Sequence, residues 1–410
     1  MPTLRAARRA SGNAEHAVHA GQRHRVEAWG STVGAAAPDP GSGYYAFEYD
    51  PAWVRDDIEL SPLHLPLGAG RRVFPTLPEQ TYRRLPALLA DAVPDRFGNA
   101  LIDAYMVNNG VQVGSVTALD RLAYIGCRGM GALEFEPPRG PQVNTATRYQ
   151  IGDLVMEARS ALSGSFGTET DATASVRHLL EVGTSAGGAR AKAVIAWNCA
   201  SGEIRGGQLG TPSGFEQWLI KLDGVGGDQQ LGATGNYGRV EYAYHLMAVA
   251  AGIDMADCAL IEEQGRAHFV TRRFDHADGQ KVHTQTLCGI AHLDFNQIGV
   301  HDYSQYLQTV RQLDLGATAE QQAFRRVAFN VAAANCDDHT KNFSFLLPRD
   351  GRWSLAPAYD VTHAYSPTGA WTFQHLMSVN AKFANITKAD LLELADGYAI
   401  ADATAAFTIR

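Results

Sequence analysis

The densest group of chemically reactive side chains lies in the stretch NCDDHTKNFSF, which begins at Asn335. Phosphoryl transfer requires that phosphates and a metal ion be held and that the attacking hydroxyl be aligned. Protein kinases use an aspartate, an asparagine placed as in D-x-x-x-x-N, and a second aspartate farther along the chain. Asp337 and Asn342 have this spacing, and Asp360 follows a predicted hairpin. The pattern predicts Asp337 as the catalytic residue, with Asp338, one position off, as the second choice.

Two other interpretations of this stretch remain open. Its charges could cap the preceding apolar segment VAFNVAAA and solvate a turn, because the D-x-x-x-x-N spacing is common by chance. Alternatively, Asp337, Asp338 and His339 could bind the metal ion of a metallohydrolase. Consecutive residues rarely point at one ion, and no second histidine-rich cluster completes such a ligand set. The hairpin and the AYD segment after it favour phosphoryl transfer.

Three features upstream could hold a nucleotide. The loop in EVGTSAGGARAKAVIAW is rich in glycine, so its backbone N–H groups could approach phosphates. It fits neither G-x-x-x-x-G-K-[ST] nor G-x-G-x-x-G, the two glycine patterns of nucleotide-binding loops, and a plain hairpin is the alternative. Lys221 is a lone cation in the apolar strand WLIKLD, where it could contact phosphates or sit at a sheet edge with its head in water. Glu241, early in the next predicted helix, could pair with Lys221 or simply favour the helix N-terminus. The order of these features is that of a kinase.

The elements expected to position these residues fall into three regions. Residues 25 to about 137 alternate like strands and include a predicted helix at YRRLPALLADAV, and PPRGPQVNTATR then marks a domain boundary. From about 150 to 271 we expect a glycine-rich loop, a helix at RVEYAYHLMAVAAGI, and strands at AKAVIAWN, EQWLIKLD and RAHFVTRRFD. The rest is predicted to be mainly helical, interrupted by a hairpin in FSFLLPRDGRWSLAPAYD that turns at PRDG.

Composition narrows the class of protein. The chain has 410 residues, 45% of them apolar and 19% charged, so we expect a globular protein of more than one domain. Its net charge of -8 argues against non-specific nucleic-acid binding by the whole surface. The five cysteines lack CxxC spacing, which argues against a disulfide framework and suits the cytoplasm. No apolar run is long enough to span a bilayer, so no membrane association is expected.

The sequence resembles the HipA-family serine/threonine kinases, the toxin components of bacterial toxin–antitoxin pairs. NCDDHTKNFSF and LAPAYDV look like the family's catalytic loop and metal-binding segment, and TSAGGARAK looks like its phosphate-binding loop. FEYDPAW, LSPLHLPL and ALDRLAYIGCRGMGALEF look like its amino-terminal domain. The resemblance implies an α+β, bilobal, protein-kinase-like fold with an amino-terminal β-rich subdomain. The expected parts are a flexible leader (1–24), the β-rich subdomain (25–140), a small lobe (150–271) and a mainly helical large lobe (272–410), whose end could be cut short.

The resemblance also implies roles for individual residues. Asp337 would be the catalytic aspartate, and Asn342 and Asp360 would bind magnesium. Lys221 would bind the phosphates of ATP and form a structural ion pair with Glu241. The remaining nucleotide-binding residues would be Gly187, Gly188, Ala189, Arg190 and Lys192 around the phosphates, Arg272, Arg273 and Phe274 at the hinge, and His339, Lys341 and Tyr359 nearby.

Regulation and partners follow from the same resemblance. Ser185 occupies the position of the loop serine that family members autophosphorylate, which silences them, and Thr184 could serve instead. The family pairs with a small HipB-like helix-turn-helix antitoxin, through which DNA would be contacted mainly indirectly. Its known targets include aminoacyl-tRNA synthetases, so a synthetase is the first expectation for the protein substrate, with arrest of translation and growth. A small-molecule phosphotransferase, an inactive co-repressor module and a solitary kinase without antitoxin stay open as alternatives.

Overall fold

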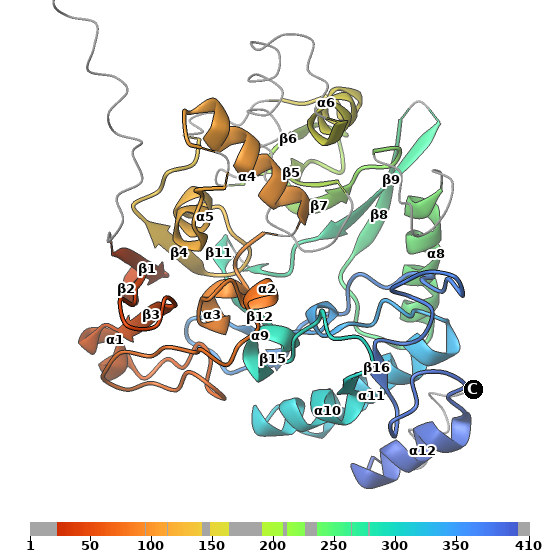
Figure 1. Ribbon diagram of the computed structural model, residues 1–410. Helices are drawn as coiled ribbons and strands as arrows, with labels where there is room; N and C mark the ends of the chain where they lie inside the picture. Colours follow the sequence, from red (N-terminus) through yellow and green to blue (C-terminus); the bar gives the residue numbers. More distant parts are fainter. Residues whose placement is uncertain are drawn as a thin grey trace, which may run out of the picture.

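The computed structural model describes residues 23–94, 96–112, 114–141, 148–163, 191–207, 211–225, 236–263, 265–277 and 279–400 (Figure 1). The chain forms a four-stranded sheet near its beginning, a five-stranded sheet in its middle and a mainly helical part after that. This mixed arrangement confirms the predicted α+β class. The domain boundaries given above stay predictions.

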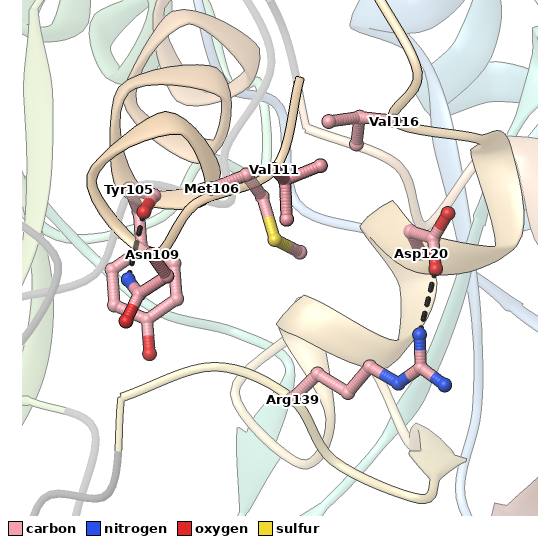
Figure 2. A pocket seen from close by; sticks show the side chains of 7 residues that line it. All are labelled: Tyr105, Met106, Asn109, Val111, Val116, Asp120 and Arg139. Carbon is pink, nitrogen blue, oxygen red and sulfur yellow. Dashed lines mark hydrogen bonds and ion pairs between the residues drawn. The ribbon is translucent and has the colours of Figure 1, made fainter. Parts of the chain in front are cut away.

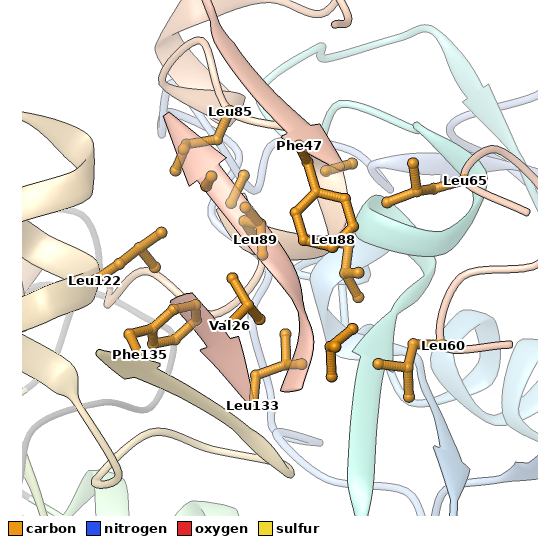
Figure 3. Packing of buried hydrophobic residues seen from close by; sticks show 14 of the residues in the cluster. Val26, Phe47, Leu60, Leu65, Leu85, Leu88, Leu89, Leu122, Leu133 and Phe135 are labelled. Carbon is orange, nitrogen blue, oxygen red and sulfur yellow. The ribbon is translucent and has the colours of Figure 1, made fainter. Parts of the chain in front are cut away.

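The first sheet consists of antiparallel strands in the order β3-β2-β1-β4. Its strands are β1 (His24–Ala28), β2 (Ser31–Pro38), β3 (Tyr45–Tyr49) and β4 (Leu133–Glu136). Buried residues alternate with more exposed ones along β1, as a strand with one covered face requires. Figure 3 shows the covered face, where Val26 and Phe135 of neighbouring strands pack against leucines from the helical segments. Burial of this apolar surface is the main force that stabilises the packing of the first sheet against these helical segments.

The helices in the first part of the chain correct one prediction. They are α1 (Pro51–Asp56), α2 (Glu79–Tyr82), α3 (Ala87–Ala90), α4 (Arg96–Asn108) and α5 (Ala118–Ile125). The single helix predicted at YRRLPALLADAV is wrong, because α2 and α3 are separate pieces. Arg83 and Arg84 between them have φ values of 52° and 62°, which end a right-handed helix, and Pro86 lacks the N–H that a continuous helix would use.

The second sheet is antiparallel and has the strand order β6-β5-β7-β9-β8. Its strands are β5 (Lys192–Trp197), β6 (Ile204–Gly206), β7 (Glu216–Lys221), β8 (Cys258–Glu263) and β9 (Arg266–Arg272). Helix α6 (Ile151–Ser163) precedes the sheet in the chain, and α8 (Tyr237–Ala250) packs against β8 and β9 (Figure 1). Strand β7 lies between β5 and β9, so Lys221 does not lie on an edge strand.

The last part surrounds a third apolar core. Its helices are α9 (Leu287–Ala291), α10 (Tyr303–Gln312), α11 (Ala317–Ala332), the single-turn η1 (Thr340–Asn342) and α12 (Lys388–Gly397). Its strands are β10 (His276–Ala277), β11 (Gln280–Lys281), β12 (His283–Thr286), β13 (His301–Asp302), β14 (Ser344–Leu347), β15 (Ser354–Leu355) and β16 (Met377–Ser378). Strands β14 and β15 pair antiparallel, so the predicted hairpin is present between Asn342 and Asp360.

Two further observations concern the cysteines and the possibility of a membrane span. All five cysteines lie within the described residues and none forms a disulfide. Among the helices that the structure describes, none combines the length and the apolarity that a membrane span requires.

Candidate active site

The predicted catalytic loop begins where α11 ends. Ala334 adopts the left-handed conformation at φ 51°, which turns the chain out of the helix, and the amide of Asn335 donates to the carbonyl of Asn330 at 2.9 Å. Across the loop, the side-chain amide of Asn342 donates to the carbonyl of Asp337 at 2.7 Å. This bond closes the D-x-x-x-x-N turn and leaves the amide oxygen of Asn342 available as a ligand. The amide of Asn335 thus caps α11, whose C-cap residue is Ala333, as the helix-cap interpretation expects. The carboxylates of Asp337 and Asp338 have other partners and take no part in this cap.

Asp337 presents a partly exposed carboxylate on this loop. The indole Nε1 of Trp371 donates to its Oδ1 at 2.7 Å, and Nε2 of His339 lies 3.7 Å from the same oxygen. The side chain is 36% exposed. The protein atoms packed around it desolvate the carboxylate and raise the pKa of Asp337. A carboxylate that is accessible and made more basic by its surroundings can accept a proton from an acceptor hydroxyl.

Asp338 has the opposite environment. Its carboxylate is fully buried and accepts three hydrogen bonds, from the hydroxyl of Tyr303 at 2.6 Å, Nδ1 of His375 at 2.7 Å and the amide of Leu376 at 2.7 Å. Burial by itself would lower the pKa of His375, but the hydrogen bond to Asp338 and its negative charge raise it to about 10. Asp338 therefore anchors the loop and is not placed to act as the base.

The metallohydrolase interpretation fails on the same geometry. Asp337 and Asp338 turn toward different partners, Trp371 for the first and His375 for the second, so the consecutive residues do not face one ion. Within the part of the chain that the structure describes, no group of three or more His, Cys, Asp or Glu residues could hold a metal.

Lys221 joins the second sheet to the segment after the hairpin. Its Nζ lies 2.5 Å from Oε1 of Glu241 on α8 and forms a second ion pair with Oδ1 of Asp360. Burial alone would lower the pKa of Lys221, but the two carboxylates hold it above its usual range. For Asp360, burial would raise the pKa, whereas Lys221 and Lys192 hold it well below its usual range. Lys221 and Asp360 are therefore charged at neutral pH.

Lys192 adds a second cation beside this cluster. It is opposite Lys221 in the register of β5 and β7, and it is buried. Asp360 itself has φ 55°, a left-handed conformation that aspartate tolerates better than most residues. Asp360 acts electrostatically on Asp337, raising its pKa, and Asn342 and Asp360 line one cavity. The structure thus brings the catalytic loop, the segment after the hairpin and the strand lysines to one place.

Replacing Lys221 with methionine should weaken binding of a non-hydrolysable ATP analogue with magnesium at least about tenfold, because a hydrogen bond to a charged group contributes about 1.5–3 kcal/mol. Titration calorimetry measures the affinity. Lys382→Met is the matched control, since Lys382 forms a partly exposed pair with Asp390 at 2.5 Å. Equal affinity in the wild type and Lys221→Met would exclude Lys221 from the phosphate site.

The predicted hinge residues have unequal surroundings. Arg272 pairs with Glu216 at 3.1 Å, and Arg273 is buried in a two-point ion pair with Asp275. The guanidinium of Arg273 is thus committed to Asp275. The ring of Phe274 lies 5.4 Å from that of Tyr359, measured between ring centroids.

Tyr359 links this hinge to the catalytic loop. Its hydroxyl donates to the carbonyl of Lys341 at 2.7 Å and is hydrogen-bonded to Ser344 at 2.5 Å. Nζ of Lys341 lies 4.8 Å from the ring centroid of Phe295, whose ring also packs near His339 at 5.5 Å. Lys341 and His339 therefore share one aromatic neighbour beside Asp337.

Most of the predicted phosphate-binding loop belongs to residues that the structure does not describe. Gly187, Gly188, Ala189 and Arg190, together with Thr184 and Ser185, lie outside the described residues.

Sequence reasoning missed the residues that hold the two aspartates from outside the loop, namely Tyr303, Trp371 and His375. They lie 34 to 37 positions from their partners along the chain. The only signal in the sequence was the presence of Trp371 and His375 after the AYD segment, and neither residue belongs to a known catalytic pattern.

Cavities elsewhere do not compete with this site. Figure 2 shows one between α4 and α5, where Arg139 pairs with Asp120 at 2.9 Å beside Tyr105 and Met106. None of the residues predicted to bind nucleotide or metal lines this cavity.

The donor set suits a hard divalent cation. Asn342 offers an amide oxygen, and Asp360 offers a carboxylate whose low pKa keeps it ionised. Mg²⁺ prefers oxygen ligands, and it is usually bound through one or two carboxylates together with substrate phosphates rather than by a complete protein cage. An incomplete set of oxygen donors beside two lysines therefore fits magnesium held jointly by protein and phosphates.

Comparisons with known proteins agree with this architecture. Residues 24–136 match the model of the HipA N-terminal domain, and residues 184–409 match that of the HipA-like C-terminal domain. A "putative kinase" of Haemophilus influenzae is 29% identical over an alignment of 134 residues, and the match covers 29% of this chain and 39% of that protein. The chain thus spans well under half the length of this relative.

A solved structure shows the same overall fold. The HipA of Shewanella oneidensis MR-1, in a complex with HipB and operator DNA, superposes with a TM-score of 0.65 at 14% sequence identity. The likeness covers 94% of this chain and 87% of that chain.

Proposed function

Because the chain belongs to the HipA family, we propose that it is a serine/threonine protein kinase that transfers the γ-phosphoryl group of ATP to a hydroxyl of another protein. The observation that carries the proposal is the convergence of Lys221, Glu241 and Asp360 beside the closed turn from Asp337 to Asn342. This set positions phosphates and a hydroxyl, which is what phosphoryl transfer requires of a protein. Nothing in it supplies a covalent nucleophile, and none is needed.

Each residue has a defined task in the proposed reaction. Lys221 and Lys192 supply fixed positive charge for the phosphates, and Glu241 orients Lys221. Asp337 aligns the acceptor hydroxyl and takes its proton as the new bond to the γ-phosphorus forms and ADP leaves. Asn342 and Asp360 would hold magnesium, which, when bound, neutralises charge on the phosphates.

The proposed partners come from the family and from its structural neighbour. The solved relative is a HipA bound to HipB and operator DNA, which supports a HipB-like helix-turn-helix antitoxin as partner here too. The net charge of -8 suits a protein that contacts DNA mainly through such a partner. We propose an aminoacyl-tRNA synthetase as the first substrate to test, with arrest of translation as the result of its phosphorylation.

Autophosphorylation at Ser185 should silence the enzyme. A phosphoserine carries nearly two negative charges at neutral pH and would repel ATP from a phosphate-binding loop. We therefore expect Ser185→Ala to stay active and Ser185→Asp to bind magnesium–ATP at least about tenfold more weakly, as a like charge beside phosphates predicts. Titration calorimetry measures the affinity of each variant for magnesium–ATP. A wild-type affinity in Ser185→Asp would reject this switch, and Thr184→Asp tests the neighbouring hydroxyl in the same way.

One experiment separates the proposed function from its alternatives. The protein is incubated with γ-labelled ATP, magnesium and a bacterial lysate, and label is followed by electrophoresis and by chromatography of small molecules. Label in one or a few protein bands supports a protein kinase. Label only in small molecules would indicate a small-molecule phosphotransferase, and absence of magnesium-dependent ATP binding would indicate an inactive binding module.

A further inference from the structure

We propose that Trp371 is a positioning residue for phosphoryl transfer, holding the carboxylate of Asp337 in its working orientation. The inference rests on the proposed function and adds a residue outside the catalytic loop. The segment from Trp371 to Leu376 reaches both aspartates of the loop: Trp371 donates to Asp337, and His375 and Leu376 donate to Asp338, each at 2.7 Å. One short segment therefore fixes two adjacent carboxylates that have different roles.

The segment is itself anchored at both ends. The amide of Ser366 donates to the carbonyl of Thr372 at 3.0 Å, and the amide of His375 donates to the carbonyl of Phe383 at 2.9 Å. Immediately after it, Met377 and Ser378 form β16, which pairs in parallel with β13. An indole carried on such a tethered segment is held in place before any substrate arrives.

The chemistry of the indole suits this task. Its N–H is a donor and never an acceptor, so its bond to Asp337 requires a carboxylate oxygen that can accept. The terminal torsion of an aspartate is soft, and one fixed hydrogen bond to Oδ1 defines where Oδ2 points. The indole is neutral, so it orients the carboxylate without cancelling its charge.

The two oxygens of Asp337 are consequently unequal. Trp371 and His339 both lie on the side of Oδ1, at 2.7 Å and 3.7 Å. Among the described residues, no hydrogen bond is donated to Oδ2. The ring of His339 also lies edge-to-face to that of Trp371 at 6.2 Å, so the two neighbours of Oδ1 support each other. Oδ2 is the oxygen left to receive an acceptor hydroxyl.

Two other roles make different predictions. If Trp371 only fills space, then loss of its N–H should leave the rate unchanged. If it blocks the base, then acceptors must displace it, and loss of the N–H should raise the rate. If Trp371 positions Asp337, then loss of its N–H should lower the rate and leave nucleotide binding unchanged, because the indole contacts Asp337 and not the lysine cluster.

The test uses Trp371→Phe in the full chain, with magnesium–ATP as the probe and water as acceptor, so that no protein target need be known. We expect kcat for phosphate release to fall about tenfold or more, since small misplacements at a reacting centre have effects of this order or larger. The dissociation constant of the magnesium complex of a non-hydrolysable ATP analogue should stay within about twofold of wild type, well below one tenfold step in affinity. Trp29→Phe is the matched control, because it removes another indole hydrogen bond of 2.7 Å, to the carbonyl of Lys281.

A second variant guards against misfolding of the first. Replacing Trp371 with benzothienylalanine keeps the bicyclic shape and exchanges the N–H for sulfur, so only the donor is lost. Both variants should be slow while nucleotide affinity is kept. Wild-type or raised kcat in the benzothienylalanine protein would overturn the inference and leave the proposed function standing. A Ser185→Ala protein, which cannot be silenced at that residue, would overturn both if it formed no ADP.

Discussion

Replacing Asp337 with asparagine should lower kcat for phosphoryl transfer by about 10²–10⁴-fold, the usual contribution of a general base. The amide oxygen of the variant can still accept the hydrogen bond from Trp371, so the loop geometry is kept. What disappears is the negative charge that aligns the acceptor hydroxyl and takes its proton. Initial rates of ADP formation at saturating magnesium–ATP measure this effect.

The control for this substitution is Asp350→Asn. Asp350 lies in the exposed turn of the β14–β15 hairpin, so its loss should leave the rate unchanged. Affinity for the ATP analogue should be close to wild type in both variants, because Asp337 holds the hydroxyl rather than the nucleotide. A rate for Asp337→Asn within a few-fold of wild type would remove Asp337 from the mechanism.

Replacing the neighbouring Asp338 with asparagine should act on stability instead. The carboxylate is fully buried between Tyr303, His375 and the amide of Leu376. Removing one partner of a buried ion pair typically costs about 3–5 kcal/mol, because the other charge is left without compensation. Urea unfolding followed by tryptophan fluorescence should show a loss of this size, against a change below about 1 kcal/mol for Asp337→Asn.

The pH dependence of this loss has a defined sign. His375 has a folded-state pKa of about 10, raised from an ordinary value of 6.5, so it binds its proton more tightly in the folded protein. Its contribution to stability is fully present below about pH 6.5 and is lost as the pH rises through about 10. The difference in unfolding free energy between wild type and Asp338→Asn should therefore shrink across that window. A difference that grows with pH would contradict the ion pair.

Much of the site could be predicted from local patterns. The D-x-x-x-x-N spacing marks a turn that Asn342 closes onto Asp337, and both residues lie on one continuous loop. The role of Lys221 does not follow from its neighbours in the sequence, because an isolated lysine in an apolar strand fits an edge strand equally well. The strand order places β7 between β5 and β9, and pairing over such distances is not encoded in the strand's own residues.

The parts that could not be predicted depend on contacts between distant segments. Asp337 and Asp338 are chemically identical in the sequence, and only the folded chain separates them, by giving one to Trp371 and the other to Tyr303 and His375. The sequence analysis predicted one helix at YRRLPALLADAV, whereas Pro86 and the left-handed turn before it produce two.

The most direct test of the central claim is the intact mass of the purified protein before and after incubation with magnesium–ATP, with Asp337→Asn treated in parallel. The account predicts that the wild type gains the mass of a phosphoryl group, located by peptide mapping on a serine or threonine, and that Asp337→Asn gains none. Equal gain in both proteins would contradict the role of Asp337, and a wild type that binds ATP yet shows neither phosphorylation nor ADP formation would contradict the proposed activity itself.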